Sequence, residues 1–197
     1  MNRAHLGDAF DHWKGSVIEA ISDKKLQVVP MLTDRDQWTQ EDFETYARLL
    51  HREPEDVLKN GTCDLFSSKS RDRYFCDLGE HDLFLDPDTG IAPDEKAQRQ
   101  HVRPSEIARL ISQSRSRILL IYQHASRKKD GLVEKLKLLR TAEGLTGCDI
   151  FAYDSGAVSM VVMSQNRERT DKTLACLKSW LGPVAATRII EQTKLLP

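Results

Sequence analysis

The feature that most constrains the fold is an unbroken apolar run at residues 118–122, Ile-Leu-Leu-Ile-Tyr. A strand with one solvated face alternates apolar and polar side chains, whereas a continuous apolar run indicates a strand that is buried on both faces. Such strands are typical of parallel sheets, because helices cover both faces of these sheets in α/β proteins. The run therefore predicts a parallel sheet at the centre of the molecule.

Helical and extended patterns alternate along the chain on both sides of this run. Helical spacing of apolar residues predicts helices over 8–21, from Thr39, from Pro104, over 132–139 and over 169–181. Strands are predicted at 26–32, 83–85, 149–153 and 158–163, with a hairpin between the last two. This order predicts one α/β domain over residues 1–197, with a mostly parallel, Rossmann-like sheet, helices on both faces and a C-terminal β-hairpin.

Several connecting segments carry weaker patterns. Residues 67–73 are polar and predict a loop, residues 92–100 predict an exposed charged insertion, and Ile189 with Ile190 predicts a short C-terminal helix. In the first helix, Gly15 weakens the helical pattern. Its neighbour Lys14 lies beside the apolar stripe, where solvent exposure is the simplest interpretation.

Composition limits the classes of function. The 29 Lys and Arg residues nearly balance the 30 Asp and Glu residues, so the formal net charge is −1 and nucleic acid could bind only through a local basic patch. Arg127-Lys128-Lys129 is the candidate patch. No run approaches the roughly 20 apolar residues of a membrane-spanning helix, and residues 1–5 show no signal-peptide pattern. The four cysteines lack CxxC spacing, which favours reduced thiols and a cytoplasmic protein.

Polar residues follow four of the predicted strands. They are Asp34 and Asp36, Asp86 and Asp88, Gln123 and His124, and Asp154. Ligands of open α/β sheets bind outside the carboxyl ends of the strands, where these residues would converge. Clustered carboxylates repel one another unless a cation compensates them, so the pattern predicts a divalent metal, Mg²⁺ or Mn²⁺.

The predicted roles follow from this chemistry. The candidate metal ligands are Asp86, Asp88 and His124, and these three with Gln123 are the candidate catalytic residues. The candidate substrate contacts are Arg127, Lys128, Tyr122 and Lys14. A metal beside basic residues can activate water for in-line attack on a phosphate. The leading prediction is a metal-dependent phosphodiester hydrolase, a small nuclease that acts on DNA or RNA.

Most of these residues also have a structural interpretation, whereas Asp86, directly after three apolar strand residues, is better explained by function. Asp34, Asp36, Asp88 and Asp154 stand in turns, where Asp satisfies its own backbone. A histidine at a strand end is often neutral and bonded to backbone, and a basic run is often a solvated helix start. A non-catalytic interaction module is therefore a further alternative, and it would show a large exposed apolar patch.

The LDPDTG element at residues 85–90 and the YQH element at 122–124 resemble those of a bacterial family of uncharacterised proteins. More distantly, the layout resembles class I methyltransferases and three-Cys-motif partner proteins, in which an Asp-Pro pair ends the fourth core strand and the sheet finishes in a hairpin. That resemblance implies a catalytic position for Asp86-Pro87 and S-adenosylmethionine as the alternative cofactor. The sequence contains neither GxGxxG, GxxxxGK[ST] nor GxSxG, and Pro30-Met31-Leu32-Thr33-Asp34 stands where those enzymes carry a glycine-rich loop.

Overall fold

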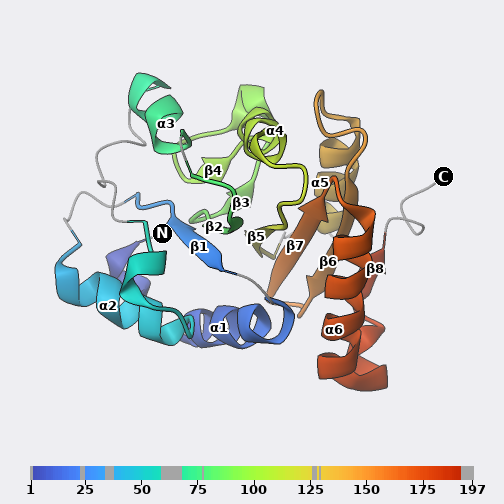
Figure 1. Cartoon of the computed structure of the whole chain (residues 1–197), viewed down its shortest axis with the longest axis horizontal. Helices are drawn as coiled ribbons and strands as arrows, with labels where there is room; N and C mark the ends of the chain where they lie inside the picture. Colours follow the sequence, from blue (N-terminus) through green and yellow to red (C-terminus); the bar gives the residue numbers. More distant parts are fainter. Residues whose placement is uncertain are drawn as a thin grey trace.

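A computed structural model describes residues 2–22, 25–33, 38–58, 68–76, 78–125, 128 and 130–191. The helices are α1 (Ala9–Ile21), α2 (Gln40–Leu49), α3 (Ser68–Tyr74), α4 (Pro104–Gln113), α5 (Gly131–Thr141) and α6 (Arg167–Ala186), with 3₁₀ turns η1 (Arg3–His5), η2 (Pro54–Asp56) and η3 (Asp94–Lys96). The strands are β1 (Leu26–Pro30), β2 (Asp82–Asp86), β3 (Gly90–Ile91), β4 (His101–Val102), β5 (Leu119–His124), β6 (Asp149–Asp154), β7 (Val158–Ser164) and β8 (Ile189–Glu191). Helices lie on both sides of the sheet, as predicted (Figure 1).

The main sheet has the strand order β1-β2-β5-β7-β6-β8. Strands β1, β2 and β5 are parallel neighbours, whereas β7 is antiparallel to both β5 and β6, and β8 is antiparallel to β6. The sheet is therefore mixed, because β7 and β8 run against the other four strands. The predicted hairpin is present, and it inserts β7 between β5 and β6.

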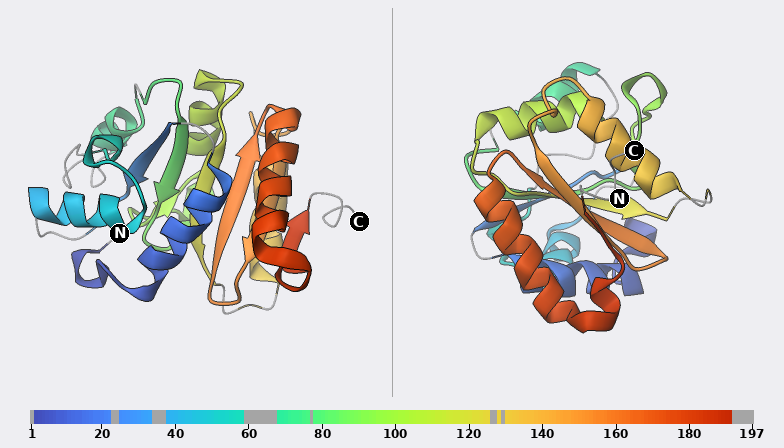
Figure 2. Two further views of the ribbon diagram at one scale, coloured as in Figure 1. Left: turned by 60° about the horizontal axis from the view of Figure 1, so that its bottom comes forward. Right: turned by 90° about the vertical axis from the view of Figure 1, so that its right-hand side faces the viewer.

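Two hydrophobic cores lie on opposite faces of the sheet. One packs beneath α1, α2 and α6 and the other beneath α3, α4 and α5, so the molecule has three layers (Figure 2). Successive strand residues point to opposite faces. Phe84 and Tyr122 accordingly lie in the first core, and Leu85 and Ile121 lie in the second. This alternation decides which residues at the strand ends can meet.

Local sequence signals explain the helix boundaries beside the strand ends. Asp8 caps α1 by accepting a hydrogen bond from the backbone N–H of Phe10 at 2.8 Å. Thr39 and Asp42 form a reciprocal capping box at the start of α2, so this helix begins where it was predicted. Close packing explains the glycine at position 15, because a Cβ there would lie 2.1 Å from the carbonyl oxygen of Leu49. The missing side chain lets α1 lie against the end of α2.

Two predictions about connecting segments need correction, and one is confirmed. The polar segment predicted as a loop is helix α3 from Ser68 onward, and residue 67 lies outside the described residues. The exposed charged insertion predicted at residues 92–100 is present: it contains η3, most of its side chains are exposed, and it is framed by β3 and β4, which form a separate parallel pair. The predicted helix at Ile189 and Ile190 is wrong: these residues form edge strand β8, whose backbone pairs with β6. Within the described ranges, no helix is long and apolar enough to cross a bilayer.

Candidate functional site

A cavity of about 340 Å³ lies at the carboxyl ends of β2 and β5, beside the start of α1. Its lining from the N-terminal segment and α1 is Asn2, His5, Asp8, Phe10, Asp11 and Lys14. Its lining from the strand ends is Asp86, Pro87, Asp88, Thr89, Tyr122 and His124. The cavity therefore brings together the predicted residues Lys14, Asp86, Asp88, Tyr122 and His124.

Lys14 is the centre of a buried network beneath the cavity. Its Nζ donates hydrogen bonds to Asp11 Oδ1 and Asp86 Oδ2, both at 2.9 Å, and the Tyr46 hydroxyl also donates to Asp86 Oδ2. Lys14 is 4% exposed, and Asp11 and Asp86 are each 1% exposed. The prediction that Lys14 is exposed to solvent is therefore wrong. Its ammonium is buried because Asp86, at the end of β2, supplies a carboxylate that binds it.

Burial and the neighbouring charges shift the pKa values of Lys14, Asp11 and Tyr46. Burial alone would lower the pKa of Lys14, but the adjacent Asp86 and Asp11 carboxylates outweigh this effect and raise it, so the side chain stays an ammonium. Burial raises the pKa of Asp11 although Lys14 opposes the shift. Burial and the Asp86 charge raise the pKa of Tyr46 well above its usual value, so its hydroxyl remains a donor. The cavity floor is a lysine held by two carboxylates.

Aromatic rings form the wall beside this floor. Lys14 Nζ lies 4.3 Å from the centroid of the Tyr122 ring, which is within the range of a cation–π contact. The Tyr122 and His124 rings meet edge to face with their centroids 4.9 Å apart. The Phe10 and His124 rings also meet edge to face, with their centroids 6.0 Å apart. Burial lowers the pKa of the half-buried His124, and the Lys14 charge lowers it further. Its imidazole is therefore neutral at pH 7.

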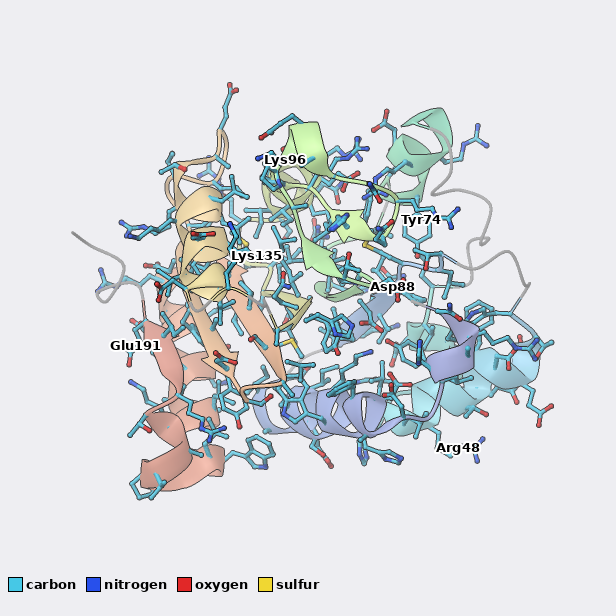
Figure 3. All side chains as sticks on the ribbon, turned by 180° about the vertical axis from the view of Figure 1, so that it is seen from behind. Arg48, Tyr74, Asp88, Lys96, Lys135 and Glu191 are labelled. Atoms are coloured by element: carbon cyan, nitrogen blue, oxygen red, sulfur yellow. The ribbon has the colours of Figure 1, made fainter. Side chains whose placement is uncertain are left out.

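Asp88 lies at the half-exposed side of the same cavity. The Thr33 hydroxyl, in the segment after β1, donates a hydrogen bond to Asp88 Oδ2 at 3.0 Å. Figure 3 shows Asp88 between α1 and the β3–β4 pair. Asp86 and Asp88 thus differ in environment, because Asp86 belongs to the floor and Asp88 to the rim.

Gln123 does not line this cavity and points to the opposite face of the sheet from Tyr122 and His124. Its Oε1 accepts a hydrogen bond from the backbone N–H of Ile91 at 2.8 Å, and its Nε2 donates to the carbonyl oxygen of Thr89 at 3.2 Å. The side chain is buried and packs directly on Gly90, where a Cβ would lie 2.2 Å from Gln123 Oε1. The structure therefore places Gln123 as an anchor for the segment that follows Asp88.

The other predicted site residues lie elsewhere. Lys128 is exposed, does not line the cavity, and has its Nζ 3.9 Å from Glu134 Oε2. Asp154 accepts hydrogen bonds from Gly156 N–H and from the Ser159 hydroxyl at the β6–β7 turn, which matches its structural interpretation. The predictions for Arg127, Asp34 and Asp36 fall outside the described residues.

Sequence reasoning missed part of the site. Asp8 and Asp11 stand at the start of a predicted helix, where acidic residues are common and carry no special signal. Asp11 and Lys14 have the spacing of an ordinary surface ion pair on a helix. Tyr46 occurs in the apolar stripe of α2 like any core residue. Only tertiary structure distinguishes these residues from structural ones: Tyr46 bonds Asp86, and Asp11 shares Lys14 with Asp86. Asp8 is distinguished only by its place in the cavity lining.

The cavity and its surroundings fit a divalent metal ion better than they fit S-adenosylmethionine. Within the described ranges, no three His, Cys, Asp or Glu side chains form a ready-made metal site. Two donors, Asp88 and His124, nevertheless line one cavity. For S-adenosylmethionine the fit is poorer, because Met31, Leu32 and Thr33 are all buried where a glycine-rich loop would be expected. The segment after β1 thus carries buried side chains in place of a glycine-rich loop.

Comparisons with known proteins give no family to set beside this geometry. No family model, curated protein or solved structure matches the chain. The function must therefore be argued from the cavity itself.

Proposed function

We propose that the protein is a metal-dependent phosphodiester hydrolase and that the cavity is its active site. The observation that carries the proposal is the charge of the lining. Four carboxylates (Asp8, Asp11, Asp86 and Asp88) meet one lysine, which leaves three negative charges apart from the histidines. A cavity with this negative charge attracts cations. It would repel a phosphate group unless a bound cation compensated the charge.

Asp88 and His124 are the residues that would hold the metal. Mg²⁺ in phosphate-processing enzymes is held by one or two carboxylates and completed by water and substrate oxygens, so a full protein cage is not required. Mn²⁺ additionally accepts imidazole. A bound divalent ion would supply charge compensation and an activated water. Asp86 receives a different role, because Lys14 and Tyr46 already bond its carboxylate.

The chain's own groups complete the proposal. His124 has an alternative role where Asp88 holds the ion without it: its neutral imidazole can then accept a proton, and its position on the cavity wall suits that task. Lys14 holds Asp86 and the end of β2 in place. The partly exposed Phe10 ring offers an apolar face on which a nucleobase could stack, which supports a nucleic-acid substrate.

Calorimetry with Mn²⁺ and Mg²⁺ tests the proposal. We expect the wild-type protein to bind Mn²⁺, Asp88→Asn and His124→Gln each to weaken binding at least tenfold, and Asp154→Asn, at another strand end, to bind like wild type. Cleavage of single-stranded DNA and RNA should require the metal and should fall with the same two variants. Absence of metal binding by the folded wild-type protein, or unchanged binding by Asp88→Asn, would contradict the proposal.

A methyltransferase-like function is the second candidate, and the sheet supplies its support. Strand β2 ends in Asp86-Pro87 beside the parallel strand β1, and the β6–β7 hairpin inserts β7 antiparallel between β5 and β6. The resemblance noted above would make Asp86 a catalytic residue. A thermal shift with S-adenosylmethionine separates the candidates, because ligand at 100 times its Kd stabilises a protein by about 2.7 kcal/mol. A shift with S-adenosylmethionine and none with Mn²⁺ would favour methyl transfer.

A further inference from the structure

The β3 segment is held to the main sheet by two side chains. Its backbone pairs with β4 in a sheet of two strands, separate from the main sheet. Gln123 on β5 binds the Ile91 N–H and the Thr89 carbonyl, and Lys135 on α5 donates to the Ile91 carbonyl oxygen at 2.7 Å. Side chains here take the place of a strand ladder.

Lys135 and Gln123 also bind each other. Lys135 Nζ donates to Gln123 Oε1 at 2.9 Å, and the same Oε1 accepts from Ile91 N–H. Figure 3 shows Lys135 on α5, the helix beside this part of the sheet. The amide and the ammonium therefore form one connected bridge from α5 through β5 to β3.

The bridge has an electrostatic cost. Burial lowers the pKa of Lys135 to about 8, which means that the surroundings of this side chain destabilise its charged form. A methionine would fill similar space without that cost. The benefit that the structure shows is the pair of donors that Lys135 gives to Ile91 and Gln123.

We propose that Lys135 and Gln123 are positioning residues that set the rim of the cavity by anchoring residues 89–91. Asp88 directly precedes the anchored segment, and Thr89 lines the cavity itself. Loss of the bridge frees this segment from β5 and lets the Asp88 carboxylate move. The effect on metal binding rests on the proposed function, whereas the anchoring of β3 does not.

Lys135→Met tests the proposal, with Lys137→Met on an exposed position of the same helix as the control. We expect amide exchange at Ile91 to become at least tenfold faster in Lys135→Met and to stay unchanged in Lys137→Met. Lys135→Arg, which keeps a cationic N–H donor, should restore at least half of the protection. The unfolding midpoint of Lys135→Met should be no lower than that of wild type, because a buried charge has been removed.

Metal binding separates this proposal from the proposed function. Lys135→Met should bind Mn²⁺ about tenfold more weakly than wild type, with Lys137→Met unchanged. Faster exchange at Ile91 together with no Mn²⁺ binding by the wild-type protein would support the anchor and contradict the hydrolase. Unchanged exchange at Ile91 in Lys135→Met would overturn the anchor whatever the metal result.

Discussion

Removal of the Lys14 charge is the sharpest test of the buried network. Lys14→Met keeps the length of the side chain and leaves two carboxylates, Asp11 and Asp86, buried without their shared cation. At an effective dielectric constant of about 20, a contact of 2.9 Å carries roughly 6 kcal/mol of Coulomb attraction, most of which desolvation offsets. Loss of one partner of a buried pair costs about 3–5 kcal/mol. For a chain of this size that is a fall in Tm of roughly 6–20 °C.

The pH dependence of this loss identifies its cause. Without Lys14, nothing offsets the effect of burial on Asp11 to the same extent, so the pKa of its carboxyl should lie further above its unfolded value than in wild type. Such a group contributes stability at low pH that is lost as pH rises through the raised pKa. The deficit of Lys14→Met relative to wild type should therefore be largest near pH 8 and should shrink towards pH 5.

Urea unfolding at pH 8 and pH 5 measures the effect. Lys25→Met is the control, because Lys25 is 64% exposed and lies 3.9 Å from Asp56, so its loss should change stability by less than about 0.5 kcal/mol. Lys14→Met with Asp86→Asn should recover part of the loss, since one stranded charge is gone. A deficit below about 1 kcal/mol, or one that is equal at both pH values, would refute the reasoning.

Three further predictions concern packing. Gly90→Ala should lower the free energy of unfolding by about 2–4 kcal/mol in urea titrations, because Gly90 has φ +102° and a Cβ would overlap Gln123; wild-type stability would contradict this. Gly15→Ala should lower it by about 1–3 kcal/mol despite the better helix propensity of alanine, because the methyl group meets the Leu49 carbonyl oxygen, and a stabilised variant would argue against the close approach of α1 and α2. Burial raises the pKa of Cys148 to about 11, so mass spectrometry should find it unmodified by a thiol reagent at pH 8 until the protein unfolds.

The sequence was sufficient to predict where most elements lie, because their patterns are local. The apolar run at 118–122 lies in β5 from Leu119 onward, and the turn signals at Asp86-Pro87 and around Gly156 stand where β2 ends and where β6 joins β7. The edge strand β8 could not be predicted in this way. Its three residues are too few for a periodicity, and only pairing with β6 makes them a strand.

The candidate site was predictable in part, and one further step was available from the sequence. On a strand buried on both faces, Tyr122 and His124 must point to one face and Gln123 to the other. That alternation already separates the cavity wall from the anchor of β3. The floor could not be predicted, because Lys14 and Asp86 are 72 positions apart and their contact depends on the packing of α1 over β2.

The buried lysine also limits how this cavity can be redesigned. Asp86 and Lys14 hold helix α1 and strand β2 together, so a change to either affects stability and ligand preference at once. Asp8 and Asp88 are only half-buried at the rim, and their charges can be exchanged without leaving Lys14 unpaired. A directed-evolution experiment that selects for anionic ligands should therefore change the rim first and keep the floor. The same protein could then be adapted to new ligands while its fold stays intact.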